Sequence, residues 1–210
     1  MSEVEPSNGL RAPGAARARD FDAIYADGRP PWDIGRPQSA FRELADRGRL
    51  VGRVLDVGCG TGEHALMAAS IGLDATGVDA AGTAVEIARR KAAERDVSAR
   101  FLTWDALELA ELGESFDTVV DCGLFHVFDD PDRSRFVRAL GDAMPVGARY
   151  FMLCFSDLEP GDWGPRRIHQ DEIRVCFEDG WSVEQIEPAK LEITVEPGSV
   201  RAWLATILRV

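Results

Sequence analysis

A glycine-rich loop between an apolar strand and a helix-forming run constrains this chain more than any other feature. Residues 55–62 read Leu-Asp-Val-Gly-Cys-Gly-Thr-Gly, so Gly58, Gly60 and Gly62 occupy alternate positions. Glycine adopts positive φ and lets a ligand approach the backbone closely. The helix beyond presents free N–H groups and the positive end of its dipole to the same point. The loop predicts a nucleotide-like cofactor at the end of the first strand, since an ordinary tight turn needs one such glycine, not three.

The spacing of the glycines separates two classes of cofactor. A dinucleotide fingerprint needs a small residue at position 63, where this chain has Glu63. A carboxylate at the helix N-terminus would also repel a pyrophosphate. Gly-x-Gly-x-Gly preceded by Asp56 instead resembles the first motif of class I S-adenosylmethionine (SAM) methyltransferases, whose ligand carries an ammonium and a carboxylate rather than a diphosphate. The resemblance implies that Asp56 serves the cationic end of the ligand.

The length and charge of the chain limit the kinds of partner that it can have. A chain of 210 residues suits one domain that buries roughly 70% of its unfolded surface. Its 24 Lys and Arg against 36 Asp and Glu give a net charge of -12, and nucleic-acid binding needs a basic face instead. Plain solubility explains the acidity equally well. We therefore expect a small-molecule substrate and no nucleic-acid partner, with the chain acting as a monomer or a homodimer.

Neither a membrane segment nor a secretory signal is indicated. The longest stretch without a charged residue runs from His64 to Leu73, about half of the roughly 20 apolar residues that a membrane span requires. No apolar run follows Met1. We expect a cytoplasmic protein with no membrane partner.

The four cysteines predict neither a disulfide framework nor a metal centre. They are far apart in the sequence and form no C-x-x-C pair, the spacing that a zinc cluster would need. We expect reduced and mostly buried thiols and no bound metal. The four are Cys59, Cys122, Cys154 and Cys176.

Composition divides the chain into a short arm and one domain. Residues 1–19 mix Pro, Gly, Ala, Arg and Glu without an apolar period and are typical of a flexible arm. Residues 20–210 form the predicted domain. Within it we expect an N-terminal lid and helix at 20–50, a cofactor-binding core at 51–155, and a substrate loop with the C-terminal strands at 156–210.

Strands and helices alternate through the domain, which predicts a parallel sheet covered on both faces. We expect a Rossmann-like three-layer αβα sandwich whose seven-stranded sheet is mostly parallel, with the last strand antiparallel. The predicted strands are 53–57, 75–79, 99–103, 116–121, 148–155, 181–192 and 200–209, and the predicted helices are 38–47, 63–71, 83–95, 132–144 and 170–178.

Polar and aromatic residues stand where the predicted strands end, which is where open α/β sheets bind ligands. Asp79 ends the second strand, beside Ala80, and its carboxylate can accept both hydroxyls of a ribose or cap the following helix. The run Trp104-Asp105-Ala106 follows the third strand and can stack on and hydrogen-bond an adenine, or form core and cap. Asp121 ends the fourth strand, nearest the expected site of chemistry.

These motifs extend the resemblance over about residues 20–209. The run Pro31-Trp32-Asp33-Ile34-Gly35-Arg36-Pro37 is similar to the N-terminal lid motif of the thiol, thiopurine and halide methyltransferase branch. It is also similar to that of bacterial enzymes that O-methylate hydroxylated aromatic heterocycles. The resemblance implies that Trp32 closes over the sulfonium end of SAM.

His126 is the candidate general base, because it lies just past the fourth strand and histidine titrates near neutrality. The alternative is that its imidazole only shapes the pocket or pairs with a backbone group. Aromatic walls suit a flat, apolar acceptor. Besides His126, the predicted acceptor-binding residues are Phe21, Tyr25, Phe125, Phe155 and Trp163.

The sequence as a whole predicts an enzyme that moves the methyl group of SAM to an O, S or N atom of a small aromatic or heterocyclic molecule and yields S-adenosylhomocysteine (SAH). Aligning the two reactants can supply roughly 7 to 11 kcal/mol of the barrier. Two alternatives stay open at this point. One is an NAD-dependent oxidoreductase, and the other is a SAM-binding regulator or partner subunit without turnover.

Overall fold

The computed structural model describes residues 14–210, with side chains from Phe21 onward. Helix α1 spans Gly14–Asp27 and so includes the last six residues of the arm predicted at 1–19. The run Gly-Ala-Ala-Arg-Ala-Arg at 14–19 consists largely of strong helix formers. The rest of the predicted arm, residues 1–13, lies outside the described residues.

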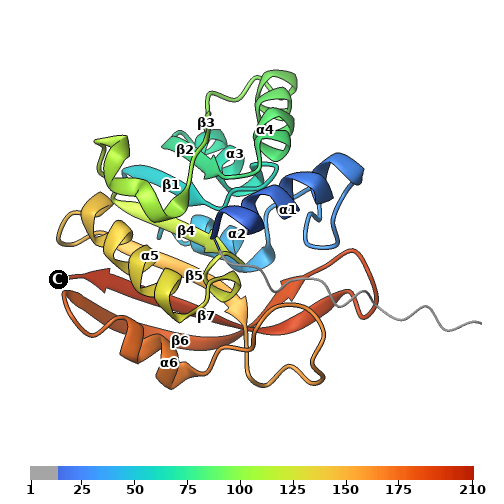
Figure 1. Ribbon diagram of the computed structural model, residues 1–210. Helices are drawn as coiled ribbons and strands as arrows, with labels where there is room; N and C mark the ends of the chain where they lie inside the picture. The colour runs from blue at the N-terminus through green and yellow to red at the C-terminus, as the bar shows by residue number, and fades with distance from the viewer. Residues whose placement is uncertain (1–13) are drawn as a thin grey trace, which may run out of the picture.

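Seven strands form one sheet in the order β3-β2-β1-β4-β5-β7-β6 (Figure 1). Strands β1 to β5 pair in parallel, and β7 runs antiparallel to both of its neighbours. The predicted Rossmann-like sheet with an antiparallel last strand is confirmed. The strands are β1 (Arg53–Val57), β2 (Asp74–Asp79), β3 (Arg100–Thr103), β4 (Thr118–Cys122), β5 (Arg149–Phe155), β6 (Trp181–Glu192) and β7 (Ser199–Arg209).

Helices cover both faces of the sheet, as the alternating strand and helix pattern predicts (Figure 1). One face packs against α5 and α6 through Phe136 and Ile173. The other packs against α2 through Phe41 and against α3 and α4 through Leu66 and Val85. The helices are α2 (Ser39–Asp46), α3 (Glu63–Ser70), α4 (Gly82–Glu94), α5 (Asp130–Ala143) and α6 (Gln170–Cys176).

Two short 3-10 helices were not predicted: η1 (Ala106–Leu112) and η2 (Phe125–Val127). They follow β3 and β4, and both are too short for the periodicity that marks an α-helix in a sequence. The other predicted elements agree with the structure to within about two residues at each end. None of the helices in residues 14–210 has the length and apolar character needed to cross a membrane.

The order of the strands reverses between β1 and β4, which lie side by side. Chain segments leaving these two strands diverge to opposite faces of the sheet and leave a crevice at their carboxyl ends. The glycine loop at 58–62 follows β1 and the segment containing His126 follows β4. The fold therefore brings these two parts of the predicted site together.

Candidate functional site

A cavity of about 430 Å³ opens at the carboxyl ends of β1 to β5. Its volume falls in the range typical of small-molecule sites. The predicted site residues that line it come from α1, the loop after it, all five parallel strand ends and the excursion after β5. They are Phe21, Tyr25, Trp32, Gly58, Gly60, Asp79, Ala80, Trp104, Asp105, Ala106, His126, Phe155 and Trp163.

Gly60 and Gly62 of the loop serve different purposes. All three glycines of the loop have positive φ, at +68° for Gly58, +50° for Gly60 and +84° for Gly62. A Cβ on Gly60 would lie 2.6 Å from the Tyr25 hydroxyl, so this glycine keeps the backbone open toward the cavity and α1. A Cβ on Gly62 would lie 2.6 Å from the Phe101 ring instead. Gly62 does not line the cavity, and its predicted contact with the cofactor is replaced by tight packing of the loop on β3.

Asp79, the last residue of β2, holds the glycine loop in place. Its Oδ2 accepts a hydrogen bond from the Gly60 N–H at 2.8 Å, and its Oδ1 accepts one from the Ala81 N–H at 2.8 Å. Burial raises the pKa of the Asp79 carboxyl, and the two backbone donors act against that rise. A carboxylate has about four acceptor sites, so two remain for a ligand in the cavity. The two roles considered for Asp79, capping and ligand binding, are compatible.

Asp56 lies beneath the loop rather than in the cavity, which corrects its predicted contact with the cofactor. The side chain is inside β1 and fully buried. Its Oδ2 accepts from the Ala65 N–H at 3.0 Å, while Oδ1 has no hydrogen-bond partner in the described residues and lies 3.8 Å from Nδ1 of His64. Burial raises the pKa of Asp56 to about 7. Asp56 fixes the start of α3 below the loop.

Asp121 is likewise buried, and its predicted contact with the cofactor is also corrected. Its Oδ1 accepts from the Leu124 N–H at 2.7 Å, and its Oδ2 accepts from the Phe125 N–H at 3.1 Å and the Tyr150 hydroxyl at 2.6 Å. These bonds shape the turn after β4. Phe125 packs into the core at 5.9 Å from the Phe177 ring and does not line the cavity, so its predicted place in the acceptor wall is wrong.

His126 lines the cavity with 6% of its surface exposed. Its Nδ1 accepts a hydrogen bond from the Phe155 N–H at 3.0 Å. A ring nitrogen that accepts has no proton, so the neutral imidazole carries its proton on Nε2. The nitrogen left for a ligand is therefore a donor. This geometry contradicts the predicted general base and agrees with the alternative, a ring paired with a backbone group.

The part of the cavity beside β4 and β5 has a wall of packed aromatic rings. The His126 and Phe155 rings meet edge to face at 5.1 Å, and Phe155 meets Trp163 edge to face at 5.8 Å. The Arg167 guanidinium lies 5.3 Å from the Phe155 ring and donates to backbone carbonyls of Glu159 and of neighbouring residues up to 165. Arg167 thus shapes the excursion that carries Trp163.

Three aromatic residues of the region predicted to hold the lid, 20–50, line the cavity: Phe21, Tyr25 and Trp32. Trp32 donates from Nε1 to the Tyr25 hydroxyl at 3.0 Å, and its ring meets those of Tyr25 and Phe21 edge to face. Tyr25 lies against Gly60 and Ala81, beside the glycine loop and apart from the rings of His126, Phe155 and Trp163, with which it makes no aromatic contact. Asp22 joins α1 to the start of α4 by accepting from the Thr83 N–H at 2.7 Å.

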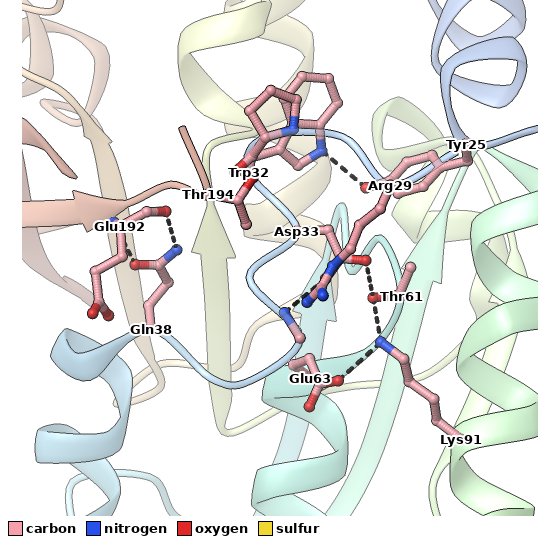
Figure 2. A network of polar contacts seen from close by, with 12 residues as sticks. Tyr25, Arg29, Trp32, Asp33, Gln38, Thr61, Glu63, Lys91, Glu192 and Thr194 are labelled. Atoms are coloured by element: carbon pink, nitrogen blue, oxygen red, sulfur yellow. Dashed lines mark hydrogen bonds and ion pairs between the residues drawn. The ribbon is translucent and has the colours of Figure 1, made fainter. Parts of the chain in front are cut away.

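A chain of polar contacts links the segment after the lid to the glycine loop (Figure 2). The Thr61 hydroxyl donates to Oδ2 of Asp33 at 2.9 Å and accepts from Nζ of Lys91 at 2.6 Å. Lys91 also contacts Glu63 at 2.9 Å, and Arg95 forms a two-pronged contact with the same carboxylate. Burial alone would raise the pKa of Glu63, but Arg95 and Lys91 hold it below its usual value.

The tip of the β6–β7 hairpin contacts residues 31–38 on the side away from Lys91 (Figure 2). Gln38 exchanges two side-chain hydrogen bonds with the backbone of Glu192, at 3.0 and 2.8 Å. Thr194 donates its N–H to the Pro31 carbonyl at 2.8 Å. The Gln38 N–H in turn donates to Nε2 of His64 at 3.3 Å. The segment 31–38 is therefore held by the glycine loop, by α3 and by the β6–β7 hairpin.

Sequence reasoning did not single out Thr61, Gln38 or Glu192. Thr61 stands inside the glycine motif, and its position next to three glycines is the one signal that could have indicated a role. Gln38 and Glu192 are 154 residues apart in the sequence. Neither belongs to a motif, so their pairing could be found from the structure alone.

Proteins similar to this chain include several methyltransferases. A family model described as a methyltransferase domain matches residues 54–146. The 2-heptyl-1-hydroxyquinolin-4(1H)-one methyltransferase of Mycobacteroides abscessus is 35% identical over 168 residues, which cover 78% of this chain and 73% of the relative. Probable thiol methyltransferase 2 of Arabidopsis thaliana is 30% identical over 160 residues, covering 72% and 68%.

Solved structures share the fold of this chain. A structure described as "Conversion of a Disulfide Bond into a Thioacetal Group during Echinomycin Biosynthesis" is 37% identical with a TM-score of 0.83, and the match covers 91% of this chain and 92% of that one. A SAM-dependent methyltransferase from Anabaena variabilis shares the fold, with a TM-score of 0.77 at 15% identity over 98% of this chain and 100% of that one. From the extent of the match to the mycobacterial relative, this chain belongs to the SAM-dependent methyltransferase family.

Proposed function

We propose that this protein transfers the methyl group of SAM to an oxygen, sulfur or nitrogen nucleophile on a small aromatic or heterocyclic molecule and releases SAH. The observation that carries the proposal is one cavity with two unlike ends. At one end are the glycine loop and Asp79, and at the other are the packed rings of His126, Phe155 and Trp163. The names of the two relatives, a hydroxyquinolinone methyltransferase and a thiol methyltransferase, support an acceptor of this class.

The residues at the first end fit SAM. Gly58 and Gly60 line the cavity with positive φ, so the backbone is open where a side chain would stand. Asp79 keeps two acceptor sites for the hydroxyls of a ribose, and it lies between the loop and Ala80. Trp104, whose Nε1 donates to the Glu108 carbonyl at 3.0 Å, offers a fixed aromatic wall beside Asp105 for an adenine.

The protein's part in such a reaction is to position the acceptor and to keep water out. SAM supplies a methyl group on a positively charged sulfur, which is already an activated donor. The aromatic wall holds a flat acceptor, and the lid residues Phe21, Tyr25 and Trp32 line the same cavity. Alignment of this kind can contribute roughly 7 to 11 kcal/mol. The division into a lid at 20–50, a cofactor core at 51–155 and a substrate region at 156–210 is part of this proposal.

The substrate is further proposed to be a small molecule and not a nucleic acid, because the net charge is -12. Titration calorimetry with SAH tests the cofactor end. Asp79→Ala is expected to weaken SAH binding at least about 10-fold, since it removes the acceptor for the Gly60 and Ala81 amides and for the ribose. Asp74→Ala is the matched control, because Asp74 is exposed at the other end of β2.

Measuring turnover distinguishes the proposed methyl transfer from the two alternative functions, an oxidoreductase and a SAM-binding regulator or partner subunit. Phenols, hydroxyquinoline-like heterocycles and aryl thiols are assayed with labelled SAM, and transfer of the label to at least one of them is expected. Hydride transfer with NAD would favour an oxidoreductase. Tight SAH binding without methylation of any acceptor would favour a regulator or partner subunit, and absence of SAH binding would end the assignment of the cavity.

A further inference from the structure

The His126 ring has a fixed orientation. The backbone N–H of Phe155 can only donate, and it donates to Nδ1 at 3.0 Å. Turning the ring over would place a C–H group against this buried N–H and leave it unpaired, which costs free energy. Nδ1 therefore stays without a proton, and Nε2 carries the N–H of the neutral ring.

That N–H is available to a ligand. Nε2 of His126 makes no hydrogen bond to any residue in the described range 14–210, and the residue lines the cavity although 94% of its surface is covered. Gly123, which also lines the cavity, has φ of +83°. A Cβ there would come within 3.3 Å of Nε2 and Cε1. The absence of a side chain at Gly123 leaves the Nε2 edge of the ring open.

The groups around the ring keep it neutral. Burial and the positive charge of Arg167, whose guanidinium lies over the Phe155 ring, lower the pKa of His126 to about 3. Cys122 also lines the cavity, and burial and the nearby Asp121 raise the pKa of its thiol. Asp121 itself accepts three hydrogen bonds and does not line the cavity. Asp132 of α5 also lines the cavity, and its Oδ1 accepts a hydrogen bond from Arg135 at 3.2 Å. The group that the His126 ring itself presents to a ligand is a donor.

Building on the proposed methyl transfer, we propose that His126 donates its Nε2–H to the ionised oxygen or sulfur of the acceptor. The substrates are then aromatic hydroxyls or thiols acidic enough to enter as anions, after losing their proton to solvent. The anion supplies the electron pair of the new bond to the methyl carbon. The bond between that carbon and the sulfonium sulfur breaks with its electron pair left on sulfur, so the step needs no proton transfer to the protein.

Two substitutions separate the donor from the rest of the ring. Asn at 126 places its carboxamide oxygen where Nδ1 accepts from the Phe155 N–H. Its side chain is too short to place an N–H at the position of Nε2. His126→Asn is therefore expected to unfold at the wild-type urea concentration and to bind SAH unchanged. Its kcat/KM for an acidic acceptor should fall about 10- to 100-fold, the range of one hydrogen bond to a charged group.

Gln at 126 reaches the position of Nε2 with an N–H but leaves the Phe155 N–H without its acceptor. His126→Gln is therefore expected to be less stable than His126→Asn and more active toward the same acceptor. Equal kcat/KM in wild type and His126→Asn would overturn the donor role. An Asn variant with normal SAH binding and higher activity than the Gln variant would also overturn it.

A series of aryl hydroxyls and thiols of graded acidity tests the acceptor class. The pH at which kcat/KM rises is expected to follow the ionisation of each acceptor, in wild type and in His126→Asn alike. One inflection at the same pH for all acceptors, lost in His126→Asn, would show a base on the enzyme and refute the proposal. SAH binding without methylation of any acidic acceptor would refute the acceptor class, whereas failure to bind SAH would refute the proposed function itself.

Discussion

The Thr61 hydroxyl donates a hydrogen bond of 2.9 Å to Oδ2 of Asp33, and this contact joins the glycine loop directly to the segment that follows the lid. Thr61 is 5% exposed and also accepts from Lys91. The other carboxylate oxygen of Asp33 accepts from the Gly35 N–H at 2.9 Å. One buried hydroxyl therefore couples the shape of the loop to the position of Trp32, the neighbour of Asp33.

Replacing Thr61 with Val removes this coupling while keeping the shape of the side chain. We expect Thr61→Val to weaken SAH binding roughly 10-fold, equivalent to about 1.4 kcal/mol, because a hydroxyl-to-carboxylate hydrogen bond is lost. Calorimetry measures the affinity, and hydrogen exchange of residues 29–36 should become faster. Thr61→Ser keeps the hydroxyl and serves as the control. Unchanged binding and unchanged exchange in the Val variant would contradict the coupling.

The contact between Trp32 and Tyr25 predicts a non-additive pair. Tyr25→Phe keeps the ring but removes the oxygen that accepts from Nε1 of Trp32 at 3.0 Å. Each of Tyr25→Phe and Trp32→Phe is expected to weaken SAH binding about 3- to 10-fold. The double variant should be little weaker than Trp32→Phe alone, since both changes remove the same bond. Strictly additive losses in calorimetry would mean that the bond does not contribute.

Comparing substitutions at Gly62 and Gly72 tests whether the third glycine of the motif is needed for packing. Both have similar positive φ, +84° and +87°. A Cβ on Gly62 would collide with Phe101 and Ala88, whereas one on Gly72 would meet nothing within 4 Å. Gly72→Ala should therefore lose about 1 kcal/mol of unfolding free energy through backbone strain. Gly62→Ala should lose roughly 1 to 3 kcal/mol more through overpacking. Equal losses in urea unfolding would refute the packing role.

Asp56 predicts a pH dependence of stability. Burial raises its pKa to about 7 in the folded protein, against about 3.9 in an unfolded chain. Between these pH values the folded state binds more protons than the unfolded state, so the unfolding free energy falls as pH rises. Asp56→Asn keeps an acceptor for the Ala65 N–H and cannot ionise. Its stability relative to wild type should therefore rise from about pH 4 to pH 7 and then level off.

Urea unfolding at pH 5, 6, 7 and 8 checks this expectation, with a slope of at most about 1.4 kcal/mol per pH unit. The difference between the two proteins isolates Asp56, because other carboxyls such as Asp121 contribute to both. Asp74→Asn is the control, since this carboxyl is exposed. A difference that stays constant with pH would show that Asp56 is ionised throughout.

The sequence located the strand ends well but could not tell which of their side chains reach the cavity. Asp79 is the last residue of β2 and lines the cavity, whereas Asp56 and Asp121 each stand one residue before the end of β1 and β4. Within a strand the side chain is held between the sheet and a packed helix. An uncertainty of one or two residues in a predicted strand end is enough to confuse the two cases.

Contacts between residues far apart in the sequence account for the other differences between the predicted site and the structure. The tautomer of His126 is set by an amide 29 residues later, in Phe155. The charge of Glu63, expected to repel a diphosphate, is balanced by Lys91 and Arg95, 28 and 32 residues later on α4 and just beyond it. Glu63 is thus weaker evidence against a dinucleotide than its position in the motif indicated. The family assignment rests on the whole pattern and on the relatives instead.

The contacts of Gln38 with Glu192 and of Pro31 with Thr194 join two parts of the chain that leave the ribosome far apart in time. Domains generally fold as units during synthesis. A nascent chain that has not yet released the β6–β7 hairpin can hold residues 31–38 from the side of the glycine loop and α3, through Asp33 and Gln38, but not from the side of the hairpin. Until translation has passed residue 194, the contacts that hold the hairpin side of residues 31–38 cannot form.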